Sequence, residues 1–122
     1  LILDEPTAGL DPRGRDKILS MLEDLHAKEN VTMIMVSHSM DDMARLASRL
    51  LVFSGGRLVA DGTPREIFAH PESMTEIGLG VPEAALLCRR LREAGVPLPE
   101  NLYRVDELKE HLLRLWKEAE KC

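Results

Sequence analysis

The spacing of apolar residues changes partway along the chain. Up to about Gly62, short apolar runs alternate with segments in which apolar residues recur every three or four positions. The runs predict buried strands and the spaced segments predict helices with one buried face, so their alternation favours βαβ units. From Thr63 onward only the helical spacing continues. We therefore expect an α/β part at residues 1–62 and a helical part at residues 63–122.

The first part contains two candidate parallel strands. Residues 1–3 are continuously apolar and residues 31–36 are nearly so, which is typical of parallel strands covered on both faces. Asp11 and Pro12 predict the start of the helix between them, because Asp caps helix N-termini and Pro suits the first turn. The Ser-Gly-Gly sequence at residues 54–56, with a β-rich run on each side, predicts a hairpin.

The second part contains three candidate helices. Thr63 and Glu66 have the spacing of a capping box, which predicts a short helix. A longer amphipathic helix is predicted at residues 82–94, and Asp106 is the expected cap of a final helix. Each of the last two helices is expected to carry an apolar stripe: Leu86, Leu87, Leu91 and Ala94 on the first, and Leu108, Leu112, Leu115 and Ala119 on the second, with Trp116 at its edge. The stripes could pack on each other and on the sheet, or a partner could cover them, and Trp116 with the leucines beside it is expected in the core.

Composition narrows the class of protein. The net charge is −5 and no run of Lys or Arg occurs, so a nucleic-acid partner is not expected. The longest apolar stretches are too short to cross a bilayer, and no basic segment followed by an apolar one marks a secretory leader. Any link to a membrane is therefore expected to run through a partner protein. Cys88 and Cys122 are far apart, which indicates a reducing cytoplasm and no disulfide framework.

The end of the first candidate strand holds two adjacent carboxylates, Asp4 and Glu5. Open α/β sheets bind ligands at the carboxyl ends of their strands. Consecutive strand residues point to opposite sides, so the two carboxylates are expected to do different work. Charges at the rim of a sheet are costly unless a cation or a bound water uses them. Phosphoryl transfer provides both uses, because one carboxylate can hold Mg²⁺ while the other activates water.

Residues 1–12, LILDEPTAGLDP, resemble the Walker B strand and D-loop of the ATP-binding-cassette ATPases, and Val-Ser-His at residues 36–38 resembles the family's switch histidine. The resemblance implies the C-terminal portion of a P-loop (RecA-like) nucleotide-binding domain, α/β in class, with parallel strands, an edge hairpin and a small helical extension. It also implies that Asp4 serves Mg²⁺ through water, that Glu5 is the catalytic base and that His38 contacts the γ-phosphate.

The D-loop match implies a second subunit. Ala8, Gly9, Leu10 and Asp11 occupy the positions that, in the family's dimer, reach the nucleotide site of the partner subunit. Asp11 is also an ordinary helix cap, and that role does not depend on a dimer. Elsewhere the simpler interpretation is favoured: Asp42 is expected to be a capping and surface residue.

Residues 61–68 resemble the segment that follows the hairpin in importer ATPases. Further along the helical part, residues 78–83, 91–98 and 105–108 resemble the C-terminal extension of energy-coupling-factor ATPases. Those subunits power the uptake of vitamins or transition-metal ions. The resemblance implies a second ATPase subunit, a transmembrane coupling protein and a substrate-binding membrane protein as partners, at the cytoplasmic face of the cell membrane. In that family the extension helps to hold two ATPase subunits together.

Several parts of a nucleotide site are missing from the sequence. No Gly-x-x-x-x-Gly-Lys phosphate loop occurs, and the family's signature motif, glutamine loop and adenine-stacking aromatic residue are also absent. The start inside an apolar run, without an initiator Met, favours a piece of a longer protein. We therefore expect ATP and Mg²⁺ to be cofactors of the full-length parent. This piece alone is expected to bind neither of them and not to hydrolyse ATP. Two alternatives stay open: an interaction module at residues 63–122, or a non-transport ATPase of the same superfamily.

Overall fold

The computed structural model describes residues 1–121, so Cys122 and any role expected of it lie outside the description. The chain forms two compact units, Leu1–Ala47 and Ser48–Cys122. This division comes before the hairpin, whereas the sequence places a domain boundary after it. The hairpin belongs to the second unit because its own second strand packs against the helix that follows it. The predicted boundary near residues 62 and 63 stays a prediction about the domains of a longer protein.

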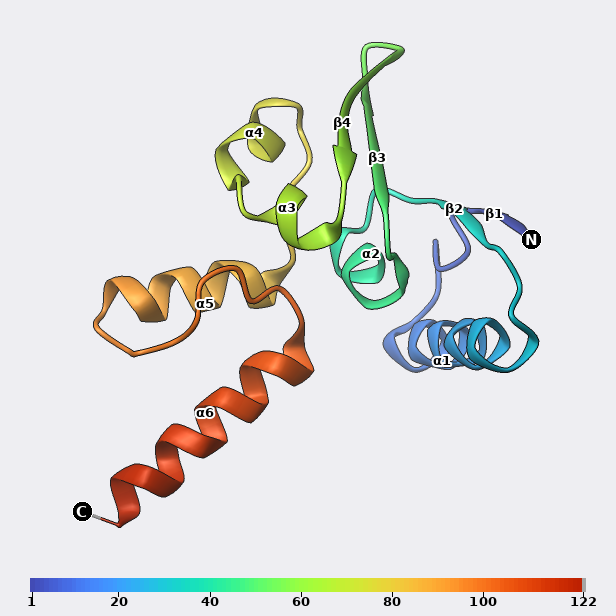
Figure 1. The fold of residues 1–122 in the computed structure, drawn as a ribbon. Helices are drawn as coiled ribbons and strands as arrows, with labels where there is room; N and C mark the ends of the chain where they lie inside the picture. Colours follow the sequence, from blue (N-terminus) through green and yellow to red (C-terminus); the bar gives the residue numbers. More distant parts are fainter. Residues whose placement is uncertain (122) are drawn as a thin grey trace. The chain divides into compact units, whose positions relative to one another are not determined.

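The first unit is a βαβα arrangement (Figure 1). Its elements are β1 (Ile2–Asp4), α1 (Pro12–Glu29), β2 (Ile34–Val36) and α2 (Met40–Leu46). The strands pair in parallel, with Ile2 opposite Ile34 and Asp4 opposite Val36. The expected pair of parallel strands joined by a helix is therefore confirmed, although the second strand is shorter than the apolar run that predicted it.

Local sequence explains where α1 begins and ends. The Asp11 side chain accepts a hydrogen bond from the Gly14 amide at 2.8 Å, and Pro12 occupies the first turn. The helix ends at Asn30, whose φ of 50° is in the left-handed region. Asn tolerates that region better than most residues because its side chain is short and polar.

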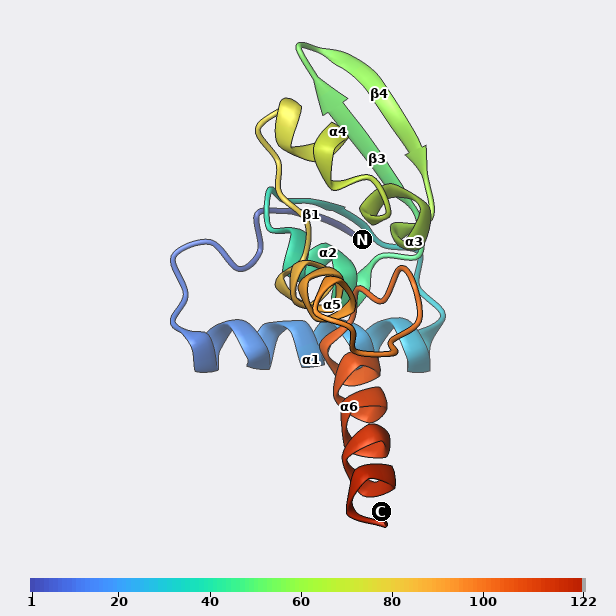
Figure 2. The same ribbon diagram turned by 90° about the vertical axis from the view of Figure 1, so that its left-hand side faces the viewer.

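The expectation that both strands are covered on both faces is wrong within the described part of the chain. The three residues of β1 and of β2 alternate in exposure, with Ile2 76% and Ile34 58% exposed while Leu3 and Met35 are half-buried. Both views show α1 and α2 on the same side of the strand pair (Figure 1, Figure 2). One face of the pair thus presents apolar side chains to solvent.

The second unit contains a hairpin followed by four helices. Its elements are β3 (Leu50–Ser54), β4 (Arg57–Gly62), α3 (Pro64–Phe68), α4 (Pro71–Glu76), α5 (Glu83–Glu93) and α6 (Val105–Glu120). The strands are antiparallel, with an irregularity between Val52 and Phe53. Gly55 and Gly56 turn the chain with φ of 58° and 74°, values that glycine adopts without steric cost. The predicted hairpin and the capping box of α3 are both confirmed.

The buried core of the second unit differs from the predicted stripe. Leu86 and Leu87 are exposed, at 41% and 48%, whereas Cys88 is buried. The buried residues of α5 are the small Ala84 and Cys88, which lie in one cluster with Leu98 and Leu102 of the connector at residues 94–104. The core cluster consists of Ala84, Cys88, Leu98, Leu102 and Leu108, with Leu91, Val96, Leu112 and Leu115 packed against it.

The final helix also begins earlier than predicted. Its cap is Arg104 rather than Asp106, whose carboxylate lies in the first turn and accepts the Glu107 amide at 3.0 Å. An acidic residue there is favourable because it meets the positive end of the helix dipole. The expected core position of Trp116 is wrong: the side chain is 67% exposed. Among the described residues, no helix combines the length and apolar character that a membrane crossing requires.

Candidate functional site

Glu5 and His38 meet at the carboxyl ends of β1 and β2. The two strands are parallel, so their ends lie at the same edge, with Glu5 directly after one and His38 shortly after the other. His38 Nδ1 lies 2.9 Å from Glu5 Oε1, and the His38 amide donates to the same oxygen at 3.2 Å. The imidazole side chain is 81% exposed and the carboxylate side chain 34%. Two residues distant in sequence therefore form one accessible acid–base pair.

A sharp turn after β1 positions Glu5. Its φ of 46° lies in the left-handed region, which costs a non-glycine residue about 1–2 kcal/mol. Two hydrogen bonds hold this conformation: the Glu5 amide donates to the Val36 carbonyl at 2.8 Å, and the Glu5 carbonyl accepts the Ala8 amide at 3.2 Å. Glu5 thus lies beyond the strand, so the alternation expected of consecutive strand residues does not decide where its side chain points.

Asp4 is the last residue of β1 and is exposed. Within residues 1–121 its carboxylate has no hydrogen bond or ion pair. No group of three or more His, Cys, Asp or Glu residues in that range could hold a metal ion by itself. Asp4 is therefore available as a single carboxylate ligand but not as part of a complete protein cage.

The predicted D-loop residues form an exposed turn between β1 and α1. Ala8, Gly9, Leu10 and Asp11 are all exposed. Gly9 has a φ of 74°, and the Leu10 amide donates to the Thr7 carbonyl at 3.3 Å. The turn is therefore ordered by its own backbone and presents its side chains outward.

Asp11 has a structural role that substitution can separate from any role in a dimer. Because its side chain caps α1, Asp11→Ala is expected to lower the free energy of unfolding by about 1 kcal/mol, whereas Asp11→Asn keeps a capping oxygen and changes it little. Urea unfolding of the chain, followed by circular dichroism, measures both variants. Equal losses for Ala and Asn would contradict the capping role.

The structure also shows a residue whose importance the sequence did not reveal. Asp42 is 1% exposed and pairs with Arg15, so the expectation of a surface residue is wrong. A buried carboxylate must be paired or hydrogen-bonded, and such a partner 27 positions away cannot be found from local spacing. The sequence did offer one signal for a carboxylate partner: Thr7 and Arg15, whose side chains can donate hydrogen bonds, follow Asp4 and Glu5 closely.

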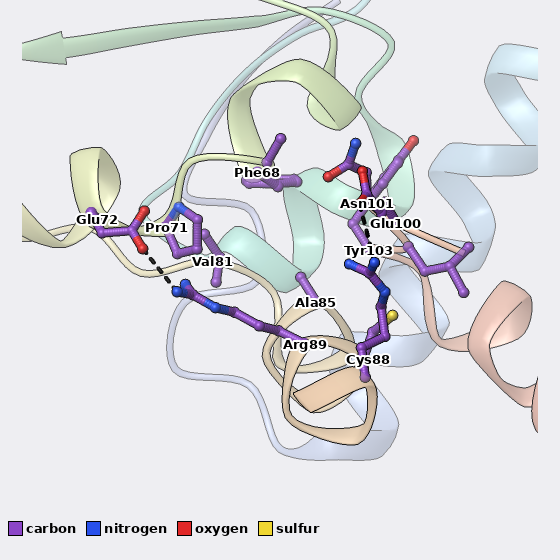
Figure 3. A pocket seen from close by; sticks show the side chains of 13 residues that line it. Phe68, Pro71, Glu72, Val81, Ala85, Cys88, Arg89, Glu100, Asn101 and Tyr103 are labelled. Atoms are coloured by element: carbon purple, nitrogen blue, oxygen red, sulfur yellow. Dashed lines mark hydrogen bonds and ion pairs between the residues drawn. The ribbon is translucent and has the colours of Figure 1, made fainter. Parts of the chain in front are cut away.

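A hollow of about 260 Å³ lies in the second unit, lined by α5, the start of α4 and the connector before α6 (Figure 3). Its charged groups are paired: Arg89 with Glu72 at 3.0 Å, and Arg92 with Glu100 at 3.1 Å. Burial raises the pKa of the Cys88 thiol, so this thiol is a poor nucleophile at neutral pH. The hollow therefore offers neither a free charge nor a reactive group, and it is a weaker candidate than the Glu5–His38 pair.

No protein-family model matches the chain. It is 47% identical over 114 residues to the energy-coupling factor transporter ATP-binding protein EcfA2 of Caldanaerobacter subterraneus, covering 93% of the chain and 40% of that protein. The EcfA2 of Symbiobacterium thermophilum is 50% identical over 107 residues, which cover 88% of the chain and 37% of that protein. The chain thus spans about 40% of the length of the curated relatives it matches.

A solved structure agrees with these relatives. CbiO1 from Clostridium perfringens, described as part of the ABC transporter complex CbiONQ, aligns with a TM-score of 0.54 and 32% sequence identity. The alignment covers 77% of this chain and 35% of CbiO1. The predicted α/β class and the predicted resemblance are both confirmed: over nearly all its residues this chain is similar to part of the ATP-binding subunits of energy-coupling-factor transporters, within the ATP-binding-cassette family.

Proposed function

We propose that this chain is part of an ATP-hydrolysing subunit of an energy-coupling-factor importer, to whose nucleotide site it contributes Asp4, Glu5 and His38. The observation that carries the proposal is the 2.9 Å contact between Glu5 Oε1 and His38 Nδ1 at the adjoining ends of two parallel strands. Relatives named as ATP-binding proteins of such transporters support it.

Glu5 is suited to act as the general base. Its Oε1 is contacted by the His38 amide and by His38 Nδ1, while Oε2 has no hydrogen-bond partner in the described part of the chain. A fixed carboxylate with one free oxygen can orient a water molecule and take its proton as that water attacks the γ-phosphate. The left-handed backbone at Glu5 supplies the fixed orientation.

The protonation of the His38 ring decides which of its two nitrogens can donate a hydrogen bond. A neutral imidazole has one N–H group. If Glu5 is ionised it can only accept, so the contact at Nδ1 uses that N–H. Nε2 can then donate to a phosphate oxygen only if the ring carries a second proton, or if Nδ1 releases Glu5 and the ring proton moves to Nε2. The pair thus links the state of the base to the γ-phosphate contact.

Asp4 fits one position in the coordination of Mg²⁺. In nucleotide sites Mg²⁺ is bound by one or two carboxylates together with phosphate oxygens and water, and does not need an all-protein cage. An exposed, unpaired carboxylate at the end of β1 has the required chemistry. When bound, the ion would neutralise charge on the phosphates. Asp4 would hold it through water, beside the Glu5 that activates the attacking water.

The exposed turn at residues 8–11 is proposed to meet a second ATPase subunit, so that Ala8, Gly9, Leu10 and Asp11 approach the partner's nucleotide site. A transmembrane coupling protein and a substrate-binding membrane protein would complete the assembly at the cytoplasmic face of the membrane. The transported substrate would be a vitamin or a transition-metal ion, selected by the membrane component.

A second role, dimerisation through the helical part, has its own supporting observation. Three large apolar side chains of α6 are exposed, with Val105 at 71%, Leu113 at 50% and Trp116 at 67%. A partner surface could bury them. This role adds to the proposed function, since the ATPase site would lie in the first unit and this surface in the second.

The proposed function predicts different responses of the chain and of the full-length subunit to MgATP. The chain lacks a Gly-x-x-x-x-Gly-Lys loop, so its melting temperature should not change. When MgATP is at a hundredfold excess over its Kd, the free energy of unfolding of the full-length subunit should rise by about 2.7 kcal/mol. Its melting temperature should then rise by several degrees. Differential scanning fluorimetry measures both.

Either opposite outcome is informative. Clear stabilisation of the isolated chain by MgATP would contradict the claim that the phosphate-binding part lies elsewhere. A full-length subunit with no response would contradict the proposed function itself. MgCl₂ without ATP is the matched control.

A further inference from the structure

Asp42 is the one charged side chain that is buried among residues 1–121. A carboxylate out of water is costly unless donors surround it. Both of its oxygens have donors: Thr7 Oγ1 lies 2.5 Å from Oδ2, and Arg15 Nε lies 2.7 Å from Oδ1. Arg15 Nη2 contacts Oδ1 as well. One residue of α2 therefore holds both the turn after β1 and the first part of α1.

The same arginine reaches the segment that carries His38. Arg15 Nη2 donates to Ser39 Oγ at 3.1 Å, and this hydroxyl oxygen also accepts the Asp42 amide at 3.3 Å. The Ser39 amide donates to Ser37 Oγ at 3.0 Å. His38 thus lies between two serines that hydrogen-bond to each other, and the second of them belongs to the Asp42 network.

Thr7 brings the other member of the catalytic pair into the same network. It lies two residues after Glu5, in the turn where the Ala8 amide donates to the Glu5 carbonyl at 3.2 Å. No hydrogen bond or ion pair of the described chain joins Asp42 directly to Glu5 or His38. Asp42 therefore reaches both members of the pair only through their neighbours.

We propose that Asp42 is a positioning residue for the Glu5–His38 pair. Asp42 holds the turn after β1, the start of α1 and the cap of α2 in one arrangement. That arrangement keeps the Glu5 carboxylate within hydrogen-bond distance of the His38 ring. Buried polar networks in which every member is satisfied rigidify their surroundings, so losing one donor loosens the neighbours as well. The inference rests on the proposed function, since the pair matters for turnover only if it activates water.

Thr7→Val in the full-length subunit is the sharpest test, because it removes only the hydroxyl that Asp42 binds. A small displacement of catalytic groups is expected to lower kcat for MgATP about 10- to 100-fold. KM should change little. The melting temperature should fall by a few degrees, because Asp42 Oδ2 loses its donor, so kcat is compared well below that temperature, where both proteins are folded. Thr7→Ser restores the hydroxyl and should restore kcat. Thr32→Val, at an exposed threonine of the same unit, is the matched control.

Asp42→Asn is the second variant, with Asp24→Asn on the exposed face of α1 as its control. We expect Asp42→Asn to lower kcat at least as much as Thr7→Val; if it does not fold, the Thr7 series still decides. Unchanged kcat in Thr7→Val overturns the inference, as does a loss that Thr7→Ser shares or one that only follows a lowered melting temperature. If Glu5→Gln retains turnover, the assignment of Glu5 as the base within the proposed function fails instead, and that result is separate from every Thr7 outcome.

Discussion

Glu5→Gln in the full-length subunit is expected to lower steady-state ATP turnover about 10²- to 10⁴-fold while ATP still binds. Glutamine keeps the shape of the side chain and an oxygen for the His38 donors, but it cannot take a proton from water. The variant therefore separates the chemistry of the carboxylate from its structural role. Phosphate release measures turnover, and fluorescence of a bound ATP analogue measures affinity.

The matched control is Glu29→Gln, at the exposed last residue of α1, for which turnover should be unchanged. Turnover within a few-fold of the unmodified subunit in Glu5→Gln would remove Glu5 as the base. A loss of ATP affinity equal to the loss of turnover would indicate that the carboxylate serves binding rather than chemistry.

Leu108→Ala is expected to destabilise the second unit by about 2–5 kcal/mol. The side chain is 5% exposed and belongs to the core cluster that joins α5, the connector and α6. Removing it leaves a cavity, because the leucines around it come from separate segments that cannot all move inward together. Urea unfolding of the chain, followed by circular dichroism, gives the change in stability.

Leu113→Ala on the same helix provides the comparison. This side chain is 50% exposed, so its removal should change the free energy of unfolding by no more than about 0.5 kcal/mol. Similar losses at the two leucines would contradict the assignment of the buried face of α6. Any loss of subunit pairing in Leu113→Ala, without loss of stability, would instead support the proposed dimerisation surface.

The sequence predicted those elements whose signals are local. The cap at Asp11, the capping box at Thr63 and the double glycine at residues 55–56 each act within a few residues, and each lies where expected. The pairing of residues 2–4 with residues 34–36 was also predictable, since a helix between two apolar runs favours a parallel pair.

The candidate site was predictable as a set of residues, from the family resemblance, but not as a geometry. Strand alternation alone gives no direction for Glu5, because its left-handed φ depends on hydrogen bonds to Val36 and Ala8. The contact with His38 likewise requires the strand register.

Features decided by long-range packing were not predictable. The burial of Asp42 depends on Arg15 and Thr7, which are 27 and 35 positions away. The buried face of α5 depends on the leucines of the connector, so helical spacing alone favoured Leu86 and Leu87 over Cys88. The partners of Asp42 lie outside the window in which periodicity operates, and the path of the connector cannot be read from the helical spacing of α5.

The most direct test of the central claim, that Glu5 and His38 act as one catalytic unit, is a double-mutant cycle in the full-length subunit. Single-turnover ATP hydrolysis is compared among Glu5→Gln, His38→Ala and the double variant. Residues that act as a unit are strongly non-additive. We predict that the double variant is about as slow as Glu5→Gln alone. Losses that multiply would contradict the claim, because they would show that the carboxylate and the imidazole contribute independently.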